Sequence, residues 1–294
     1  MLGFVGAARY GRRMQDYLAK PLSPSRMNSF LDCELLFRYR TIDRLPERPG
    51  QAAFKGTLLH SVLEDMFELA PRERSLERVS EMLHPALVRH LSEEPELGFA
   101  VDESLAWPDG ESSPSEESIA ALLESARLLA SNYFKLEDPQ ILMPSEREHH
   151  VEVELPSGLK IHGIVDRIER TATGDVRISD YKTGKAPGER WMDKYWFQMK
   201  FYALLLQKSE GVLARELRLI FLGNTQLARK VPSESEMQEF EIEVTALAGK
   251  IRRAVESGSF TPKPSKLCDW CAHTALCPAK GGTLLPLPYT PTER

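Results

Sequence analysis

Two alternating segments surround a short loop in the middle of the chain, and this loop constrains the fold more than any other sequence feature. The loop is Ala172–Gly174, with glycine at the position that needs a left-handed backbone. A three-residue loop of this kind pairs Thr171 with Asp175 and so fixes the register of both strands. In that register Asp166 lies directly opposite Asp180, on the same face of the sheet.

Two carboxylates placed opposite each other repel, so this register has a chemical consequence. A divalent cation between Asp166 and Asp180 would remove the repulsion, and the sequence therefore predicts a metal site. Lys182 follows Asp180 by two residues and projects from the same face, where its ammonium group can stabilise charge on a phosphate. Tyr181 points to the opposite face. The alternative is an exposed face that carries ordinary ion pairs.

The spacing of apolar residues changes at Pro144 from a helical period to strand alternation. Before it, the pattern predicts helices at 26–39, 53–69, 76–93 and 116–136, with an acidic surface loop between the last two. After it, the pattern predicts strands at 148–155, 159–169 and 176–181, a helix at 193–208, a strand at 217–222 and a helix at 235–257. This order predicts an α/β (α+β) fold.

The same patterns divide the chain into five segments. We expect a flexible leader at 1–24, a helical region at 25–143, a core at 144–232, a C-terminal helix with cysteines at 233–280 and a tail at 281–294. A chain of 294 residues with 42% hydrophobic content can bury a full core, as one elaborated domain or as two packed lobes.

The overall charge neither supports nor excludes a nucleic-acid partner. The net charge of -5 argues against a globally basic surface, but a local basic groove can exist within an acidic total. No apolar run is long enough to span a membrane, and the first residues do not resemble a signal peptide, so we expect a cytoplasmic protein. The sequence also lacks a GxxxxGK[ST] phosphate-binding loop, which predicts no nucleotide cofactor and no helicase activity of its own.

In a reducing compartment, the four cysteines are better explained as metal ligands than as disulfides. Cys268, Cys271 and Cys277 follow the spacing C-x2-C-x5-C, and Cys33 lies far upstream. Thiolates in this spacing suit zinc and iron-sulfur clusters equally. Either group would join the N-terminal helix to the C-terminal segment and restrict the unfolded chain.

Several separated motifs together resemble the signature of RecB-like nucleases in the PD-(D/E)xK superfamily. They are Gly163-Ile164-Val165-Asp166-Arg167, Asp180-Tyr181-Lys182-Thr183-Gly184 and Gln198-x-x-x-Tyr202, preceded by His60 on a helix. The resemblance covers roughly residues 25–280. It implies a restriction-endonuclease-like core with a mixed central sheet flanked by helices, a helical N-terminal insertion and a C-terminal cluster-binding segment.

The resemblance also implies a metal-ligand set. Asp166 and Asp180 would bind Mg2+ or Mn2+, with His60 as a third ligand and the carbonyl of Tyr181 as a fourth. An imidazole ligand shifts the preference toward Mn2+. Lys182 would help to place the nucleophile for phosphodiester hydrolysis.

Two further pairs of residues belong to the expected catalytic site. Gln198 and Tyr202 share one side of their helix and would touch DNA or brace the catalytic strand; the alternative is a polar helix face with one packed aromatic. Family members often carry another acidic residue on the first strand. Alternation places Glu146 and Glu148 on one face, so both remain candidates.

One subset of RecB-like nucleases, which includes CRISPR-adaptation and AddB-type domains, places one cysteine before the core and three after it around a 4Fe-4S cluster. This chain resembles that layout. The resemblance therefore implies a 4Fe-4S cluster, first of all structural, with zinc as the alternative occupant. Its ligands would be Cys33, Cys268, Cys271 and Cys277.

Basic and aromatic residues interleave in and after the hairpin, a combination that suits stacking on single-stranded bases. The predicted DNA contacts are Arg167, Lys185, Arg190, Lys194 and Trp196. The alternative is that the aromatic side chains only pack the following helix onto the sheet.

The predicted function is a metal-dependent DNA nuclease, an exonuclease that favours single-stranded DNA in repair or recombination. Any unwinding would need a helicase or another repair partner. One alternative is a non-catalytic DNA-binding or scaffold subunit of a repair or CRISPR-adaptation complex. Another is a zinc-stapled protein-interaction module.

Overall fold

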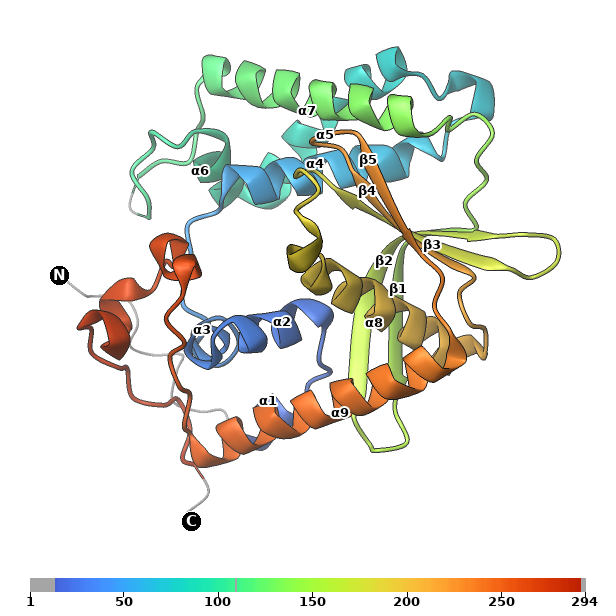
Figure 1. The fold of residues 1–294 in the computed structure, drawn as a ribbon. Helices are drawn as coiled ribbons and strands as arrows, with labels where there is room; N and C mark the ends of the chain where they lie inside the picture. Colours follow the sequence, from blue (N-terminus) through green and yellow to red (C-terminus); the bar gives the residue numbers. More distant parts are fainter. Residues whose placement is uncertain (1–13, 109, 292–294) are drawn as a thin grey trace. The chain divides into compact units, whose positions relative to one another are not determined.

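The computed structural model describes residues 14–108 and 110–291, which form two compact units (Figure 1). Unit 1 comprises Met1–Glu47, Val151–Gly163 and Glu234–Arg294, and unit 2 comprises Arg48–His150 and Ile164–Ser233. The first half of the predicted leader lies outside the described residues. The five segments expected from the sequence remain a prediction.

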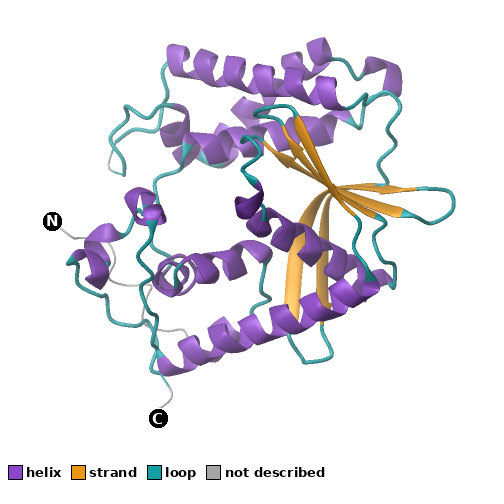
Figure 2. Cartoon of the chain, viewed as in Figure 1, coloured by secondary structure: helices purple, strands orange, loops and turns teal. Residues whose placement is uncertain are grey.

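Five strands form one mixed sheet in the order β1-β2-β3-β4-β5 (Figure 2). The pairs β2–β3 and β4–β5 are antiparallel, and β3–β4 is parallel. This sheet with its flanking helices confirms the predicted α/β fold class. The strands are β1 Glu146–Glu154, β2 Lys160–Arg170, β3 Val176–Lys182, β4 Glu216–Phe221 and β5 Gln226–Lys230.

Helices cover both faces of the sheet in unit 2. Helices α4, α5 and α7 bury their apolar stripes on the face where Tyr181, Ile220 and Leu222 point. Phe221 points to the opposite face, where its ring contacts Tyr195 of α8. These helices and the short α6 are α4 Gln51–Met66, α5 Leu76–Glu93, α6 Gly98–Val101, α7 Glu116–Leu136 and α8 Asp193–Glu210.

Backbone hydrogen bonding between β3 and β4 continues beyond their last paired residues, Lys182 and Phe221, and fixes the loop that follows Lys182. The amide of Leu222 donates to the carbonyl of Lys182 at 2.8 Å, and that of Gly223 donates to the carbonyl of Gly184 at 3.1 Å. A Cβ at Gly223 would lie 2.6 Å from the carbonyl carbon of Gly184. Glycine is therefore needed at this close approach.

Unit 1 gathers segments from both ends of the chain. Aromatic packing joins them, because the ring of Phe37 makes an edge contact with Phe30 and stacks on Phe260. A π-helical turn, Arg38–Asp43, follows α3, and short 3-10 turns carry the C-terminal cysteines. The helices are α1 Met14–Leu18, α2 Pro24–Asp32, α3 Glu34–Phe37 and α9 Glu234–Ser257.

The predicted helix at 26–39 is wrong in its continuity. The observed helix begins at Pro24, where the Ser23 hydroxyl accepts from the amide of Arg26. It ends before Cys33, whose φ and ψ are -166° and 121°. The apolar stripe continues on both sides of Cys33, so periodicity alone did not show the break. Strand β5 was not predicted, because its residues QLARK alternate only weakly.

No helix among the described residues has both the length and the apolar character needed to cross a membrane.

Candidate active site and cysteine site

The loop at residues 172–174 sets the register that its sequence predicts. The backbone of Gly174 has a φ of 87°, and the amide of Thr171 donates to the carbonyl of Asp175 at 3.0 Å. In the observed register Arg167 pairs with Ser179. The same register places the next residues, Asp166 and Asp180, opposite each other. Arg167 donates to the hydroxyl of Tyr181 on the other face, so strand alternation places the preceding residues, Asp166 and Asp180, together on one face as predicted.

Three side chains in unit 2 bring possible metal-binding atoms within 4.8 Å of one another: His60, Glu148 and Asp166. The Nδ1 atom of His60 lies 3.5 Å from Asp166 Oδ2 and 3.9 Å from Glu148 Oε1, and its Nε2 atom lies 3.0 Å from the Tyr181 carbonyl oxygen. Helix α4 positions the imidazole because Leu59 and neighbouring apolar residues anchor the helix in the core.

The structure separates the two acidic candidates on the first strand. Glu146 forms an ion pair with Arg170 at 3.1 Å, whereas Glu148 joins His60 and Asp166. Glu148 has a φ of 41°, which interrupts the regular alternation of β1. Simple alternation places both glutamates on one face, so the sequence could not choose between them.

A chain of polar contacts links Asp180 to helix α8. Lys182 Nζ lies 2.7 Å from Asp180 Oδ2 and donates to Gln198 Oε1 at 2.9 Å. Gln198 Nε2 in turn donates to the hydroxyl of Tyr202 at 2.7 Å. The structure thus brings Gln198 and Tyr202 to the same face as the acidic pair, as their spacing of four residues predicts.

The electrostatics of the site fit a divalent cation. Burial and the neighbouring Asp180 carboxylate raise the pKa of Asp166 to about 7. Burial also raises the pKa of Glu148, and the buried Oδ1 atom of Asp180 has no hydrogen-bond partner. A group of buried carboxylates with too little compensating positive charge, next to an imidazole, matches the ligands that Mn2+ and Mg2+ accept.

Mn2+ should raise the melting temperature of the protein more at about pH 8 than at about pH 6. The pKa of Asp166 is higher in the folded protein than in the unfolded chain, so the stability of metal-free protein falls as the pH rises toward about 7. A cation replaces the bound proton and removes this loss. Thermal unfolding with and without Mn2+ measures the difference, which Asp166→Asn should abolish; an equal shift at both pH values would contradict the expectation.

The predicted DNA contact at Arg167 is wrong. This side chain is 1% exposed and forms a two-pronged ion pair with Glu137, at 2.7 and 2.8 Å. It also donates to the hydroxyls of Tyr181 at 2.7 Å and Ser179 at 3.3 Å. Arg167 therefore anchors the face of β3 that carries Tyr181 and cannot reach a phosphate. Strand alternation places Arg167 on the face opposite Asp166, and α7 covers that face here.

The other predicted DNA contacts lie in the loop after β3 and at the start of α8. Lys185, Arg190 and Lys194 are exposed, and Trp196 is half-buried. Their role remains a prediction. Trp191 is 63% exposed, and the guanidinium of Arg190 lies over its ring at 5.1 Å from the centroid.

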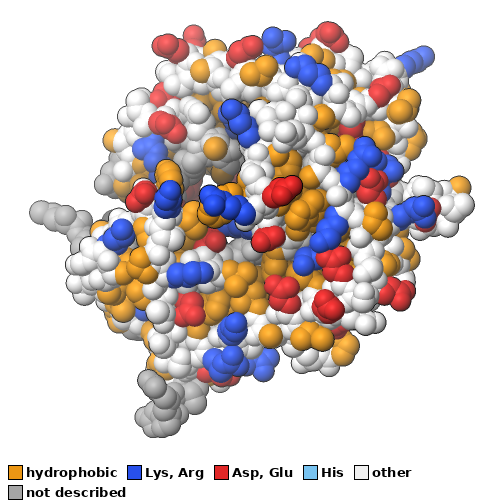
Figure 3. Space-filling view, viewed as in Figure 1, with side chains coloured by type: hydrophobic (Ala, Val, Ile, Leu, Met, Phe, Trp, Pro, Cys, Tyr) orange, Lys and Arg blue, Asp and Glu red, His pale blue; other side chains and the backbone are white. Residues whose placement is uncertain are grey.

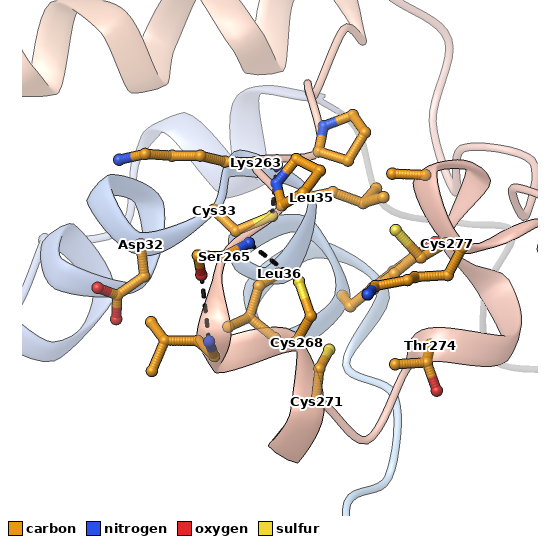
Figure 4. A pocket seen from close by; sticks show the side chains of 16 residues that line it. Asp32, Cys33, Leu35, Leu36, Lys263, Ser265, Cys268, Cys271, Thr274 and Cys277 are labelled. Carbon is orange, nitrogen blue, oxygen red and sulfur yellow. Dashed lines mark hydrogen bonds between the residues drawn. The ribbon is translucent and has the colours of Figure 1, made fainter.

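The four cysteines line one small pocket of unit 1 (Figure 4). The break between α2 and α3 turns Cys33 toward Cys268, Cys271 and Cys277. The amide of Lys263 donates to Cys33 Sγ, and that of Ser265 donates to Cys268 Sγ, both at 3.4 Å. Amide donors of this kind stabilise thiolates.

A polar network supports the cysteine segment and was not predicted from the sequence. Buried His273 lies 2.7 Å from Glu47 through its Nε2 atom, and Glu47 also accepts from Arg40. The bonds to His273 and Arg40 lower the pKa of Glu47 to about 2. The hydroxyl of Tyr39 donates to the carbonyl of Leu276 at 2.6 Å. The pocket is thus held by contacts that do not involve sulfur.

Comparison with known proteins identifies sequence relatives of this chain. The chain is 24% identical to the Gene 69 protein of Mycobacterium phage L5, over 87% of this chain and 95% of the phage protein. It is also 32% identical over 128 residues to a subunit of the ATP-dependent helicase/deoxyribonuclease of Streptococcus agalactiae, which is 44% of this chain but 10% of that protein.

A solved structure has the same fold. A protein from Eubacterium rectale, provisionally named an exonuclease, superposes with a TM-score of 0.55 over 91% of this chain and 92% of its own, at 14% identity. A sequence profile of the PD-(D/E)XK nuclease superfamily matches residues 21–278. Because this match covers most of the chain, the protein belongs to the PD-(D/E)XK nuclease superfamily.

Proposed function

We propose that this protein is a metal-dependent DNA nuclease whose active site lies in unit 2. The observation that carries the proposal is the group formed by His60, Glu148 and Asp166 beside the Asp180–Lys182 pair. This set combines cation ligands with a fixed ammonium group on one sheet face. Phosphodiester hydrolysis needs both, because negative charge develops on the phosphate during attack.

The proposed ligands are His60, Glu148, Asp166, Asp180 and the Tyr181 carbonyl, which would hold Mn2+ or Mg2+. When bound, such a cation activates water and neutralises charge on the phosphodiester. The protein supplies the orientation of these groups. The imidazole is held between the Tyr181 carbonyl and Asp166, and the hairpin fixes the register of the strand that carries Asp166.

Lys182 is proposed to act as a cation and not as a base. Burial lowers the pKa of its ammonium group, but the Asp180 and Asp166 carboxylates outweigh burial and raise the pKa above its usual value. Asp180 and Gln198 hold the Nζ atom from two sides, so little reorganisation is needed when charge develops nearby. Tyr202 orients the Gln198 amide through its hydroxyl.

We further propose that the substrate is single-stranded DNA and that cleavage begins at an end. The exposed cations Lys185, Arg190 and Lys194 and the exposed ring of Trp191 support contacts to phosphates and unstacked bases. The similarity to part of a helicase/deoxyribonuclease supports a role in repair or recombination, beside a helicase that unwinds the duplex.

The test is an assay of the purified protein on linear and circular single-stranded and double-stranded DNA, labelled at the 5′ or the 3′ end. We expect cleavage of linear single strands with Mn2+ or Mg2+ and none with a chelator. Short products from only one labelled end would give the polarity, and cleavage of circles would replace the exonuclease assignment by an endonuclease. Binding of DNA without cleavage under every metal condition would indicate a scaffold subunit.

We also propose that the cysteine pocket of unit 1 holds a 4Fe-4S cluster with a structural role. Support comes from the four thiols around one pocket and from the two amide donors to sulfur. Such a cluster would join the segment that contains Cys33 to the segment that contains Cys268. Zinc on the same thiolates is the competing occupant.

The absorption spectrum of the anaerobically purified protein should show a broad band near roughly 400 nm. Cys33→Ser should remove the band, lower the bound iron and destabilise unit 1, because only three thiolates remain. Thr274 lines the same pocket without a thiol, so Thr274→Ala should keep the spectrum of the natural protein. A colourless protein with one bound zinc would contradict the iron-sulfur assignment.

A further inference from the structure

Unit 1 contains a second cavity, of about 200 Å³, whose charged lining residues are all basic. The cations come from four parts of the chain: the segment between α1 and α2, helix α2, the start of β2, and α9. Among the described residues that line the cavity, none is acidic. In Figure 3, a small group of Lys and Arg side chains lies over the C-terminal half of α9, whereas acidic side chains lie over its N-terminal half. The four cationic lining residues are Lys20, Arg26, Lys160 and Arg252.

Backbone pairing holds two of these segments in place. Leu22 forms a parallel bridge with Ile161, in which its amide donates to the Lys160 carbonyl and its carbonyl accepts from the His162 amide, both at 3.0 Å. The guanidinium of Arg26 donates to the carbonyl of Pro21 at 2.9 Å. The backbone that carries Arg26 and Lys160 is therefore held by hydrogen bonds, which lowers the entropy cost of binding a ligand.

Three of the four lining cations are not balanced by carboxylates of the described residues. Within the described part of the chain, Arg26, Lys160 and Arg252 make no ion pair. Burial and the nearby charge of Arg44 lower the pKa of Arg26, so the folded protein holds this cation at an electrostatic cost. An anion between the three side chains would remove that cost.

We propose that this cavity binds a phosphate group. Several cations around one cavity match the charge and the hydrogen-bond needs of a phosphate, and guanidinium groups bind phosphate with two donors. The volume is several times that of a water molecule, which takes about 30 Å³. Buried Tyr17 and Phe37 add an apolar wall that can face a sugar or a base. The site does not depend on the proposed nuclease activity, because all its residues belong to unit 1.

The phosphate can belong to a nucleic-acid strand or to a small phosphorylated molecule, and three probes distinguish these sources. Inorganic phosphate, adenosine monophosphate and a single-stranded oligonucleotide are titrated into the full-length protein in the presence of a chelator, which prevents cleavage. The variant Lys160→Gln/Arg252→Gln removes two cations from the exposed rim. The control Arg253→Gln removes the same type of charge from the next position of α9, outside the lining.

We expect at least one probe to bind about tenfold more weakly to the double variant than to the natural protein, and the control to change binding less than about twofold. A loss for the two small probes assigns the site to a phosphorylated small molecule, and a loss for the oligonucleotide alone assigns it to a nucleic-acid phosphate. Equal binding of every probe to the double variant and the natural protein, with melting temperatures showing both folded, would overturn the proposal. So would a complete failure of all three probes to bind.

Discussion

Asp180→Asn should lower the rate of Mn2+-dependent DNA cleavage by about a thousandfold or more. The substitution keeps the shape of the side chain but removes the charge that faces Lys182 at 2.7 Å. It removes a proposed cation ligand and leaves the Lys182 ammonium free to turn away from Gln198. Lys182→Ala should cause a similar loss, because it removes the ammonium group itself. Single-turnover cleavage of end-labelled single-stranded DNA measures both effects.

The matched control for this loss is Asp65→Asn. Asp65 lies on α4, as His60 does, but its carboxylate is partly exposed and forms an ion pair with Arg89. The change in charge is the same, so a general electrostatic effect on DNA binding would appear in both variants. We expect the control to cleave at the rate of the natural protein. Full activity of both Asp180→Asn and Lys182→Ala would contradict the proposed active site.

Arg167→Met should destabilise the protein by about 3–5 kcal/mol, and so lower its melting temperature by roughly 10 °C. The substitution leaves the Glu137 carboxylate buried, with Arg218 at 3.4 Å as its remaining charged partner. The hydroxyl of Tyr181 also loses its donor at 2.7 Å. A buried carboxylate that loses its main charged partner costs far more than the ion pair itself contributes. Thermal unfolding followed by circular dichroism measures the shift.

Two further variants separate this explanation from simple loss of packing. The double variant Arg167→Met/Glu137→Leu removes both charges and should recover most of the stability. Arg127→Met breaks the exposed pair with Glu124 and should cost less than about 1 kcal/mol. If the double variant is as unstable as Arg167→Met, the loss of stability does not come from the buried Glu137 carboxylate that has lost Arg167.

The longer elements could be predicted because their patterns are strong and local. Helices α5 and α7 lie at the predicted residues, and the hairpin register follows from Gly174 alone. The break at Cys33 could not be predicted in this way, since both flanking segments carry the same apolar stripe. Its cause is tertiary, because the residue joins a pocket whose other members come from the opposite end of the chain.

Some residues of the candidate site could also be predicted from local patterns, and others could not. Asp166, Asp180 and Lys182 follow from register and alternation within one hairpin. Glu148 does not, because its positive φ breaks the alternation that would identify its face. Glu137 at the end of α7 carried no sequence signal, although it fixes Arg167 and, through it, the Tyr181 face of β3. Local periodicity thus identifies the residues of one face, but not the partners that other elements bring to it.

The division of the chain between the two units also affects the order in which they can form during synthesis. Apart from the short interruption at Val151–Gly163, unit 2 occupies the continuous stretch from Arg48 to Ser233. Its proposed ligands leave the ribosome before α9 does. Unit 1 needs partners from both ends of the chain, so its N-terminal helices must wait for Glu234–Arg294. A message cut short before this last segment would leave a nascent chain with the proposed active-site residues but without either the cysteine pocket or the basic cavity.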